Sequence, residues 1–270
     1  MQHNLYTQLL SRTPGHDAPC IRTADGRLYS YGDVETLSAR YANVLRSKGV
    51  VIGDRVAVQV EKSPEAIILY LACLRAGAAF LPLNPGYTIA EVEYFIDDAT
   101  PHIVVCDPKK RKDLAPICER LNVAHLLTLD AGGQGALADF AATADTAYET
   151  AAVEASDLAA ILYTSGTTGR SKGAMLTHAN LASNARTLVE YWQFTRSDVL
   201  LHALPIFHTH GLFVATNVVL MAGASMIFLP RFDSAEFRRH LPQATTLMGV
   251  PTFYTRLLNE EWLNHSTTDH

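Results

Sequence analysis

The sequence predicts an α/β fold in which helices are layered on sheets of mostly parallel strands. Two stretches, residues 54–129 and residues 157 onward, alternate short apolar runs typical of strands with longer helical patterns. Strands separated by single helices pair in parallel through right-handed crossovers, which is the basis of this prediction. Size and composition agree with it, because a chain of 270 residues with 48% hydrophobic and 18% charged residues can bury a large core.

The elements of the first stretch carry distinct start and stop signals. Val56, Val58 and Val60 recur with a period of two, which predicts a strand. Ser63 is placed to cap the helix that follows, and Gly77 to end it. The remaining elements are predicted as a strand at 79–83, a helix from the capping box Thr88–Glu91 to the residue before Pro101, a strand at 102–106, a helix at 110–121 and a strand at 125–129.

Residues 131–156 differ from both neighbouring stretches, because Ala, Gly, Thr, Asp and Glu dominate and large apolar side chains are few. We therefore expect a surface connection here, between a first α/β subdomain at 1–130 and a second at 157–270. The elements expected in the second are strands at 158–163, 174–177, 199–204, 225–229 and 245–249, and helices at 179–192, 211–221, from 235 and at 251–260.

The loop between the first two strands of the second subdomain has a composition suited to binding phosphate. Residues 164–173 contain five hydroxyl residues, three glycines and two cations, and no carboxylate. Glycines allow successive N–H groups to form one concavity, and Lys172 adds a positive charge. The spacing is not that of the Walker loop, since only two residues separate Gly166 from Gly169. A Gly/Thr-rich hairpin loop without a ligand is the alternative.

The same loop carries a family resemblance. Residues 163–173, Tyr-Thr-Ser-Gly-Thr-Thr-Gly-Arg-Ser-Lys-Gly, resemble the signature of the adenylate-forming superfamily, which includes the AMP-forming acyl-CoA synthetases. The runs at 71–85 and 91–96 resemble motifs of the family's scaffold. Many members carry Pro where this chain has Ser171, and the sequence there is similar to the malonyl-CoA synthetase branch. The resemblance implies that the chain covers only the N-terminal part of such an enzyme, truncated before its C-terminal domain, so we expect it to be inactive alone.

The resemblance also implies ATP, Mg²⁺ and coenzyme A as reaction partners. The carboxylate of the acid would attack the α-phosphate of Mg-ATP to give an acyl-adenylate and diphosphate, and coenzyme A would then displace AMP. Mg²⁺ would be held chiefly by the nucleotide phosphates, so no protein ligands to a metal are expected. Lys172 would be catalytic, because it stabilises charge on the departing diphosphate. The implied nucleotide contacts are Thr164, Ser165, Gly166, Thr167, Thr168, Gly169 and Lys172.

Three histidines lie around the strand end that Pro205 marks. Ligands of open α/β sheets bind at the carboxyl ends of strands. By the resemblance, His208 lies beside the reacting acyl group as a catalytic and substrate-binding residue, and His210 lies further into the acyl pocket. A purely structural role is the alternative for either one. A zinc site of His202, His208 and His210 is also open, although no Cys or carboxylate nearby in the sequence would complete it.

Arg256 lies among apolar neighbours in the helix expected at 251–260. An exposed helix arginine is the commoner explanation. The malonyl-CoA synthetase branch nevertheless resembles this chain there, and a guanidinium in the pocket would bind a second carboxylate as a bidentate pair. We therefore expect a small dicarboxylic acid, malonate, as the substrate. Methylmalonate, acetate and an aromatic acid are the alternatives within the class, and a catalytically incomplete nucleotide-binding module is the alternative outside it.

The composition also bears on partners and location. A net charge of −5 gives no electrostatic reason to expect nucleic acid or an anionic membrane as a partner. No stretch approaches the ~20 apolar residues of a membrane span, and the N-terminus lacks the basic region of a secretory leader. The four cysteines, at positions 20, 73, 106 and 118, show no metal-binding spacing. We expect a cytoplasmic protein with reduced, buried thiols.

Overall fold

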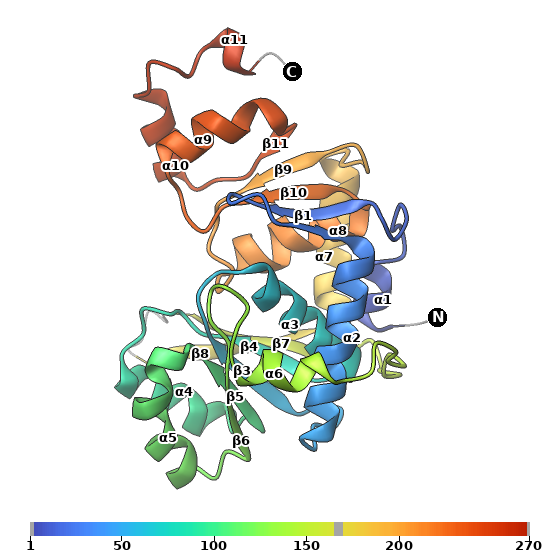
Figure 1. The fold of residues 1–270 in the computed structure, drawn as a ribbon, viewed down its shortest axis with the longest axis vertical. Helices are drawn as coiled ribbons and strands as arrows, with labels where there is room; N and C mark the ends of the chain where they lie inside the picture. The colour runs from blue at the N-terminus through green and yellow to red at the C-terminus, as the bar shows by residue number, and fades with distance from the viewer. Residues whose placement is uncertain (1–2, 165–169, 269–270) are drawn as a thin grey trace. The chain divides into compact units, whose positions relative to one another are not determined.

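The structure is a computed structural model that describes residues 3–164 and 170–268. These residues form two compact units, each with its own sheet (Figure 1). The predicted α/β class with parallel-rich sheets is confirmed. The first unit comprises Met1–Gln8 and Glu35–Ser183, and the second comprises Leu9–Val34 and Asn184–His270.

Within the described residues, the sheet of the first unit has six strands in the order β6-β5-β3-β4-β7-β8. All neighbours are parallel except β8, which is antiparallel to β7. Because β7 pairs with β4, the two strands around the predicted phosphate loop belong to this unit, whereas the expected division had placed them in the subdomain at 157–270. The strands are β3 Arg55–Gln59, β4 Ala79–Pro82, β5 Ile103–Cys106, β6 His125–Thr128, β7 Leu158–Thr164 and β8 Lys172–Thr177.

Helices α3 (Pro64–Ala76) and α4 (Ile89–Ala99) begin where the capping signals predict. The Ser63 hydroxyl accepts the N–H of Ala66 at 3.1 Å, and Gly77, with φ 73°, ends α3. Thr88 and Glu91 form the predicted capping box of α4. Every residue of α3 is buried, so it is the central helix of this unit. The other helices wholly or partly in the unit are α1 Leu5–Leu9, α2 Tyr31–Ser47, α5 Arg111–Arg120, α6 Ala136–Ala142 and α7 His178–Tyr191.

The sheet of the second unit has the order β11-β9-β10-β1-β2. Its last two strands come from the N-terminal part of the chain, where the sequence analysis expected none. β1 is parallel to β10, with Ile21 opposite Met226, and β2 returns antiparallel to β1. The strands are β1 Pro19–Thr23, β2 Leu28–Ser30, β9 Val199–His202, β10 Ser225–Phe228 and β11 Thr246–Leu247.

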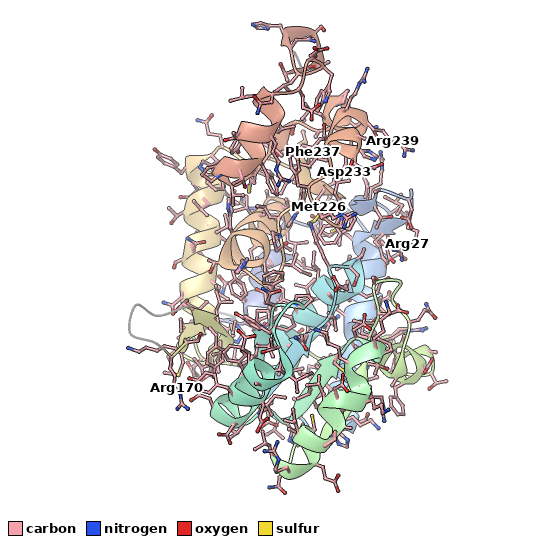
Figure 2. The ribbon with its side chains drawn as sticks, turned by 90° about the vertical axis from the view of Figure 1, so that its left-hand side faces the viewer. Arg27, Arg170, Met226, Asp233, Phe237 and Arg239 are labelled. Carbon is pink, nitrogen blue, oxygen red and sulfur yellow. The ribbon has the colours of Figure 1, made fainter. Side chains whose placement is uncertain are left out.

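The helices of this unit follow the expected order with one change of type. The helix expected at 211–221 begins as a π-helix, His210–Thr216, and continues as α8, Asn217–Ala222. In α9 (Ser234–His240), Asp233 caps the first turn and Phe237 is fully buried; both are labelled in Figure 2 together with Arg239, which is exposed. The last two helices are α10 Pro251–Leu258 and α11 His265–Thr268.

The cysteines and the helix lengths complete the description. All four cysteines are free and buried, as predicted. Burial raises the pKa of the Cys20 thiol to about 12 and that of Cys118 to about 11, which keeps both protonated. Across residues 3–164 and 170–268, no helix combines the length and the apolar character needed to cross a bilayer.

Candidate active site

The predicted phosphate loop connects β7 and β8, which form an antiparallel hairpin. The ladder begins with Leu158 opposite Thr177 and its last rung places Thr164 opposite Lys172. Both residues of that rung are exposed, so a ligand can reach the hydroxyl and the ammonium group. The other predicted contacts, Ser165, Gly166, Thr167, Thr168 and Gly169, lie outside the described residues.

The direction of β7 places this rung at a ligand-binding edge. β7 is parallel to β4, which in turn is parallel to β3, so the carboxyl ends of these strands lie at one edge of the sheet. Thr164 is the carboxyl end of β7. That edge is where open α/β sheets bind ligands, and the hairpin therefore presents the loop on the expected side.

His202 has a structural position. Its side chain is 1% exposed, its ring lies 5.2 Å from that of Phe228, and its Nε2 donates to the carbonyl oxygen of Gly211 at 2.8 Å. The Thr216 hydroxyl donates to the same oxygen at 2.9 Å. This arrangement ties the end of β9 to the start of the π-helix, and it engages Nε2 of His202 in a hydrogen bond within the fold. Among the described residues, no three His, Cys, Asp or Glu side chains are placed to hold a metal ion.

Gly211 allows the chain to pass closely over itself at this point. A Cβ atom on Gly211 would lie 2.0 Å from the carbonyl oxygen of Pro205, a distance that no side chain tolerates. The backbone from the end of β9 to the π-helix therefore depends on a residue without a side chain. This close approach holds the segment that carries the two remaining histidines.

His208 and His210 are accessible, unlike His202. His208 is exposed with its ring 4.4 Å from that of Phe207, and His210 is partly buried. Burial lowers the pKa of both imidazoles, so each is neutral at neutral pH and offers one donor and one acceptor nitrogen. His210 lines a cavity of about 300 Å³ together with Trp192, Phe194, Thr246, Leu247, Met248, Gly249 and Tyr254.

Arg256 does not line that cavity. It is exposed on α10, and its guanidinium lies 5.5 Å from the ring centroid of Phe232. Two residues along a helix are separated by about 200°, so Arg256 leaves α10 on the side opposite Tyr254, which does line the cavity. The structure therefore brings His210 together with Tyr254 and leaves Arg256 apart from both.

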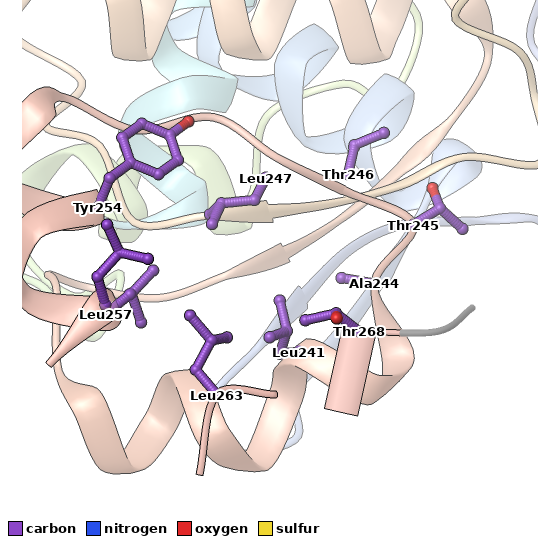
Figure 3. A pocket seen from close by; sticks show the side chains of 10 residues that line it. Leu241, Ala244, Thr245, Thr246, Leu247, Tyr254, Leu257, Leu263 and Thr268 are labelled. Carbon is purple, nitrogen blue, oxygen red and sulfur yellow. The ribbon is translucent and has the colours of Figure 1, made fainter. Parts of the chain in front are cut away.

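A second cavity in the same unit, of about 310 Å³, is shown in Figure 3. Tyr254 lines it too, and the other side chains are mostly aliphatic, including Leu241, Leu247 and Leu257. Tyr254 thus stands between two cavities of the second unit. Sequence reasoning missed Tyr254 and Trp192, because neither stands in a motif and only the tertiary fold places them beside His210.

The comparison with protein families decides the classification. The chain matches the family described as AMP-binding enzyme over residues 8–269. The chain belongs to this family. The match confirms the resemblance drawn from residues 163–173 and shows that it extends over nearly the whole chain.

Individual relatives agree with this membership. The chain is 34% identical over 236 residues to the mitochondrial malonate–CoA ligase ACSF3 of Mus musculus, covering 84% of this chain and 40% of the relative. It is 32% identical to the oxalate–CoA ligase of Arabidopsis thaliana, covering 85% of this chain and 46% of the relative. The chain therefore spans less than half the length of these curated family members.

A solved structure from the family has the same fold. Apo MatB from Rhodopseudomonas palustris superposes with a TM-score of 0.97 at 55% sequence identity, over 100% of this chain and 53% of that one. MatB bound to ATP matches equally well, over 54% of its chain. The two sheets described above are thus the architecture of about half of a family member.

Proposed function

We propose that the chain is the nucleotide-binding and acid-binding half of an AMP-forming ligase that converts malonate to malonyl-CoA. The observation that carries the proposal is the last rung of the β7–β8 ladder, where Thr164 and Lys172 stand opposite each other in a member of the AMP-binding enzyme family. Malonate as the small dicarboxylic acid is supported by relatives named malonate–CoA ligase. ATP and coenzyme A are the co-substrates in this proposal.

In the first step, a carboxylate oxygen of malonate attacks the α-phosphorus of ATP and the bond to the bridging oxygen breaks. Diphosphate leaves with the bonding electrons, so negative charge develops on it in the transition state. Lys172 and the Thr164 hydroxyl are the described groups that would stabilise that charge, and fixed donors of this kind are often the largest catalytic contribution. Mg²⁺ would share this charge, held chiefly by the nucleotide phosphates and water.

The histidines have the second role in the proposal. A neutral imidazole can hydrogen-bond the reacting carboxylate without forming an ion pair that would reduce its nucleophilicity. His208 is proposed as that group, and His210 as a donor inside the cavity that it lines. In the second step the sulfur of coenzyme A attacks the acyl carbonyl carbon, and AMP leaves.

Arg256 is retained as the proposed partner of the second carboxylate of malonate. Its present contact with Phe232 is an exposed cation–π pair, worth about 0.5–1 kcal/mol. A bidentate pair with a carboxylate is stronger, so a bound dicarboxylate outcompetes the ring for this long side chain. This role requires Arg256 to leave Phe232 when malonate binds.

The test is ATP–pyrophosphate exchange with a panel of acids, in a full-length protein that carries this chain. We expect malonate to support the fastest exchange, ahead of methylmalonate, acetate and an aromatic acid. A different rank order would replace malonate and keep the ligase class. Exchange that no acid stimulates would overturn the ligase assignment.

The chain covers 40% of the malonate–CoA ligase of Mus musculus and 53% of apo MatB. This favours a second candidate function for the chain taken by itself, a nucleotide-binding module without ligase activity. We expect the 270-residue chain to form no malonyl-CoA from ATP, malonate and coenzyme A. The same chain with Lys172→Ala, purified in parallel, controls for contaminating enzymes. Malonyl-CoA formed by the unchanged chain above that control would contradict this candidate.

Location and partners complete the proposal. The net charge of −5 supports the absence of a nucleic acid or membrane partner. A cytoplasmic location is proposed as well, and the mitochondrial relatives give the alternative compartment. Fractionation of cells that express a tagged full-length protein distinguishes the two.

A further inference from the structure

Helix α4 contacts both strands of the hairpin that carries the phosphate loop. On the β8 side, the Tyr94 hydroxyl donates to the backbone carbonyl oxygen of Ser171 at 2.7 Å. The guanidinium of Arg170, which is labelled in Figure 2, lies 5.2 Å from the ring centroid of Tyr94. Two consecutive residues before β8 are therefore attached to one side chain of α4.

On the β7 side, the contact runs through Tyr163. Its hydroxyl donates to a carboxylate oxygen of Asp98, and its ring packs against Phe95 at 4.5 Å between centroids. Tyr163 is buried, and desolvation together with the hydrogen bond to Asp98 raises its pKa well above the ordinary tyrosine value. The phenol is thus held as a donor, because the carboxylate accepts only as long as Tyr163 keeps its proton.

Tyr94 and Asp98 reach the hairpin because they are four residues apart on α4. Side chains at this spacing lie one above the other on the same helix face. The helix itself is fixed by its capping box and by Val92, Phe95, Ile96 and Ala99, which are buried in the core of the first unit. One rigid face therefore supports both strands at the point where the loop begins and ends.

The attachment acts on the two described residues of the loop. The Ser171 carbonyl belongs to the same planar peptide group as the N–H of Lys172, so the hydrogen bond from Tyr94 orients the backbone of Lys172. Tyr163 directly precedes Thr164 and pairs with Gly173. A Cβ on Gly173 would lie 3.0 Å from Ile161 and 3.4 Å from the ring of Tyr163, so the glycine leaves room for that ring beside β8.

We propose that Tyr94 and Asp98 are positioning residues of the adenylation step, which hold Lys172 and Thr164 in register with the phosphates through Ser171 and Tyr163. The inference rests on the proposed function, because it takes Lys172 and Thr164 as the phosphate-binding groups. In this proposal Tyr94 and Asp98 act through Ser171 and Tyr163 and not by contact with the substrate. Their contribution is geometric, since groups that stabilise a transition state must be placed to within about 0.5 Å and a displacement of ~1 Å can cost ~10²-fold in rate.

The first experiment measures kcat and KM in pyrophosphate exchange with a full-length protein that carries this chain. Tyr94→Phe removes the hydrogen bond and keeps the ring under Arg170. We expect kcat to fall about 3- to 10-fold, the worth of one hydrogen bond, with KM for malonate unchanged. Asp98→Ala should give a similar loss, and Asp98→Asn should restore most of it, because the amide oxygen also accepts from Tyr163.

The matched control is Tyr87→Phe. Tyr87 is half-buried in the same aromatic cluster, with its ring 5.0 Å from that of Phe95, and its hydroxyl makes no hydrogen bond within the described part of the chain. If the loss of any tyrosine hydroxyl lowers kcat, both variants should show it. If Tyr94 positions the loop, only Tyr94→Phe should show a lower kcat. Equal kcat for Tyr94→Phe and Tyr87→Phe would overturn the proposal.

A second measurement does not depend on catalysis. Amide hydrogen exchange of residues 170–173 in the purified chain should be about 3- to 10-fold faster in Tyr94→Phe than in Tyr87→Phe, because the local opening becomes easier. If Lys172→Ala keeps full pyrophosphate-exchange activity, the proposed function fails. Amide hydrogen exchange would still report whether Tyr94 holds the backbone of residues 170–173. Unchanged amide exchange in Tyr94→Phe would overturn the attachment itself.

Discussion

The β7–β8 hairpin and the segment from β9 to the π-helix differ in how their polar side chains are held in place. At the end of the β7–β8 hairpin, Thr164 and Lys172 are exposed. Side chains of α4 hold the residues adjacent to them in the chain, Tyr163 and Ser171. In the segment from β9 to the π-helix, the polar side chains are themselves part of the packing, as the buried His202 shows. The hairpin presents an exposed cation next to residues held by α4 side chains, whereas the histidine segment packs His202 into the fold and leaves His208 and His210 accessible. Activity and stability should therefore separate in the first region and change together in the second.

The largest expected effect tests the separation in the hairpin. Lys172→Ala should slow pyrophosphate exchange by roughly two to three decades, or about 2–4 kcal/mol, because a contact made mainly in the transition state is lost. The denaturation midpoint should not change, since the side chain is exposed. Lys112→Ala, an exposed lysine of α5, is the control and should change neither. Exchange that survives Lys172→Ala within a few-fold would remove the loop from the phosphate site.

The next effect sharpens the role of the second unit. Arg256→Leu should lower kcat/KM for malonate about 10²-fold, on the scale of a broken charged pair, and should affect propionate much less because propionate has no second carboxylate. Arg238→Leu, an exposed arginine of α9, is the control. Equal losses for the two acids, or none for malonate, would mean that Arg256 stays on Phe232 and that His210 acts without it.

Gly211→Ala tests whether activity and stability change together in the histidine segment. Its Cβ would meet the carbonyl oxygen of Pro205 at 2.0 Å, so the backbone must shift. We expect a loss of about 3 kcal/mol in the free energy of unfolding, at the upper end of overpacking effects, accompanied by a loss of exchange activity. Gly86→Ala meets only side-chain atoms of Asn84, the nearest at 3.2 Å, and serves as the control in chemical denaturation. A Gly211→Ala protein with unchanged stability would disprove the close approach.

The smallest expected effect is the pH dependence of stability that His178 contributes in the first unit. His178 is fully buried, its Nδ1 accepts the N–H of Leu5 at 3.0 Å, and desolvation lowers its pKa to about 4. Between about pH 6.5 and 4 the unfolded chain binds a proton there that the folded chain does not, so stability is present above this range and is lost as the pH falls through it. The contribution of His178 to the free energy of unfolding should be about 2 kcal/mol smaller at pH 5 than at pH 7.

The matched variant for this measurement is His178→Gln, whose side-chain oxygen can accept the same N–H. It should remove that part of the pH dependence while other groups continue to titrate. Urea denaturation at the two pH values provides the comparison. Identical pH slopes for the two proteins would contradict a neutral His178 in the fold.

Local signals in the sequence were sufficient to predict much of the secondary structure of the first unit. Ser63, Gly77 and the Thr88–Glu91 pair act on their own helices, so their effect does not depend on distant residues. The motif at residues 163–173 is likewise local, and its resemblance to the adenylate-forming signature indicated the family that the comparison shows. Neither signal reveals which sheet a strand joins, and for this reason the hairpin of β7 and β8 was assigned to the other half of the chain.

The features that could not be predicted all depend on tertiary contacts. The π-helix receives a contact from outside its own residues, because the carbonyl of Gly211 accepts from His202 of β9 as well as from Thr216. The face from which Arg256 leaves α10 depends on how that helix is rotated, and the sequence pattern did not settle the rotation. Tyr94 and Asp98 lie about 70 residues before their partners Ser171 and Tyr163, and no local pattern connects them.

The N-terminal hairpin has a consequence for the synthesis of the protein. β1 pairs on its parallel side only with β10, and Met226 follows its partner Ile21 by about 200 residues. At ribosomal rates of about 5–20 residues per second, Ile21 and the fully buried Cys20 wait roughly 10–40 s for that partner. The first unit can close its own sheet during this interval, because its last strand ends at Thr177. The hairpin of β1 and β2 is therefore among the last segments to be folded, and its apolar residues are exposed to chaperones for longer than the strands of the first unit.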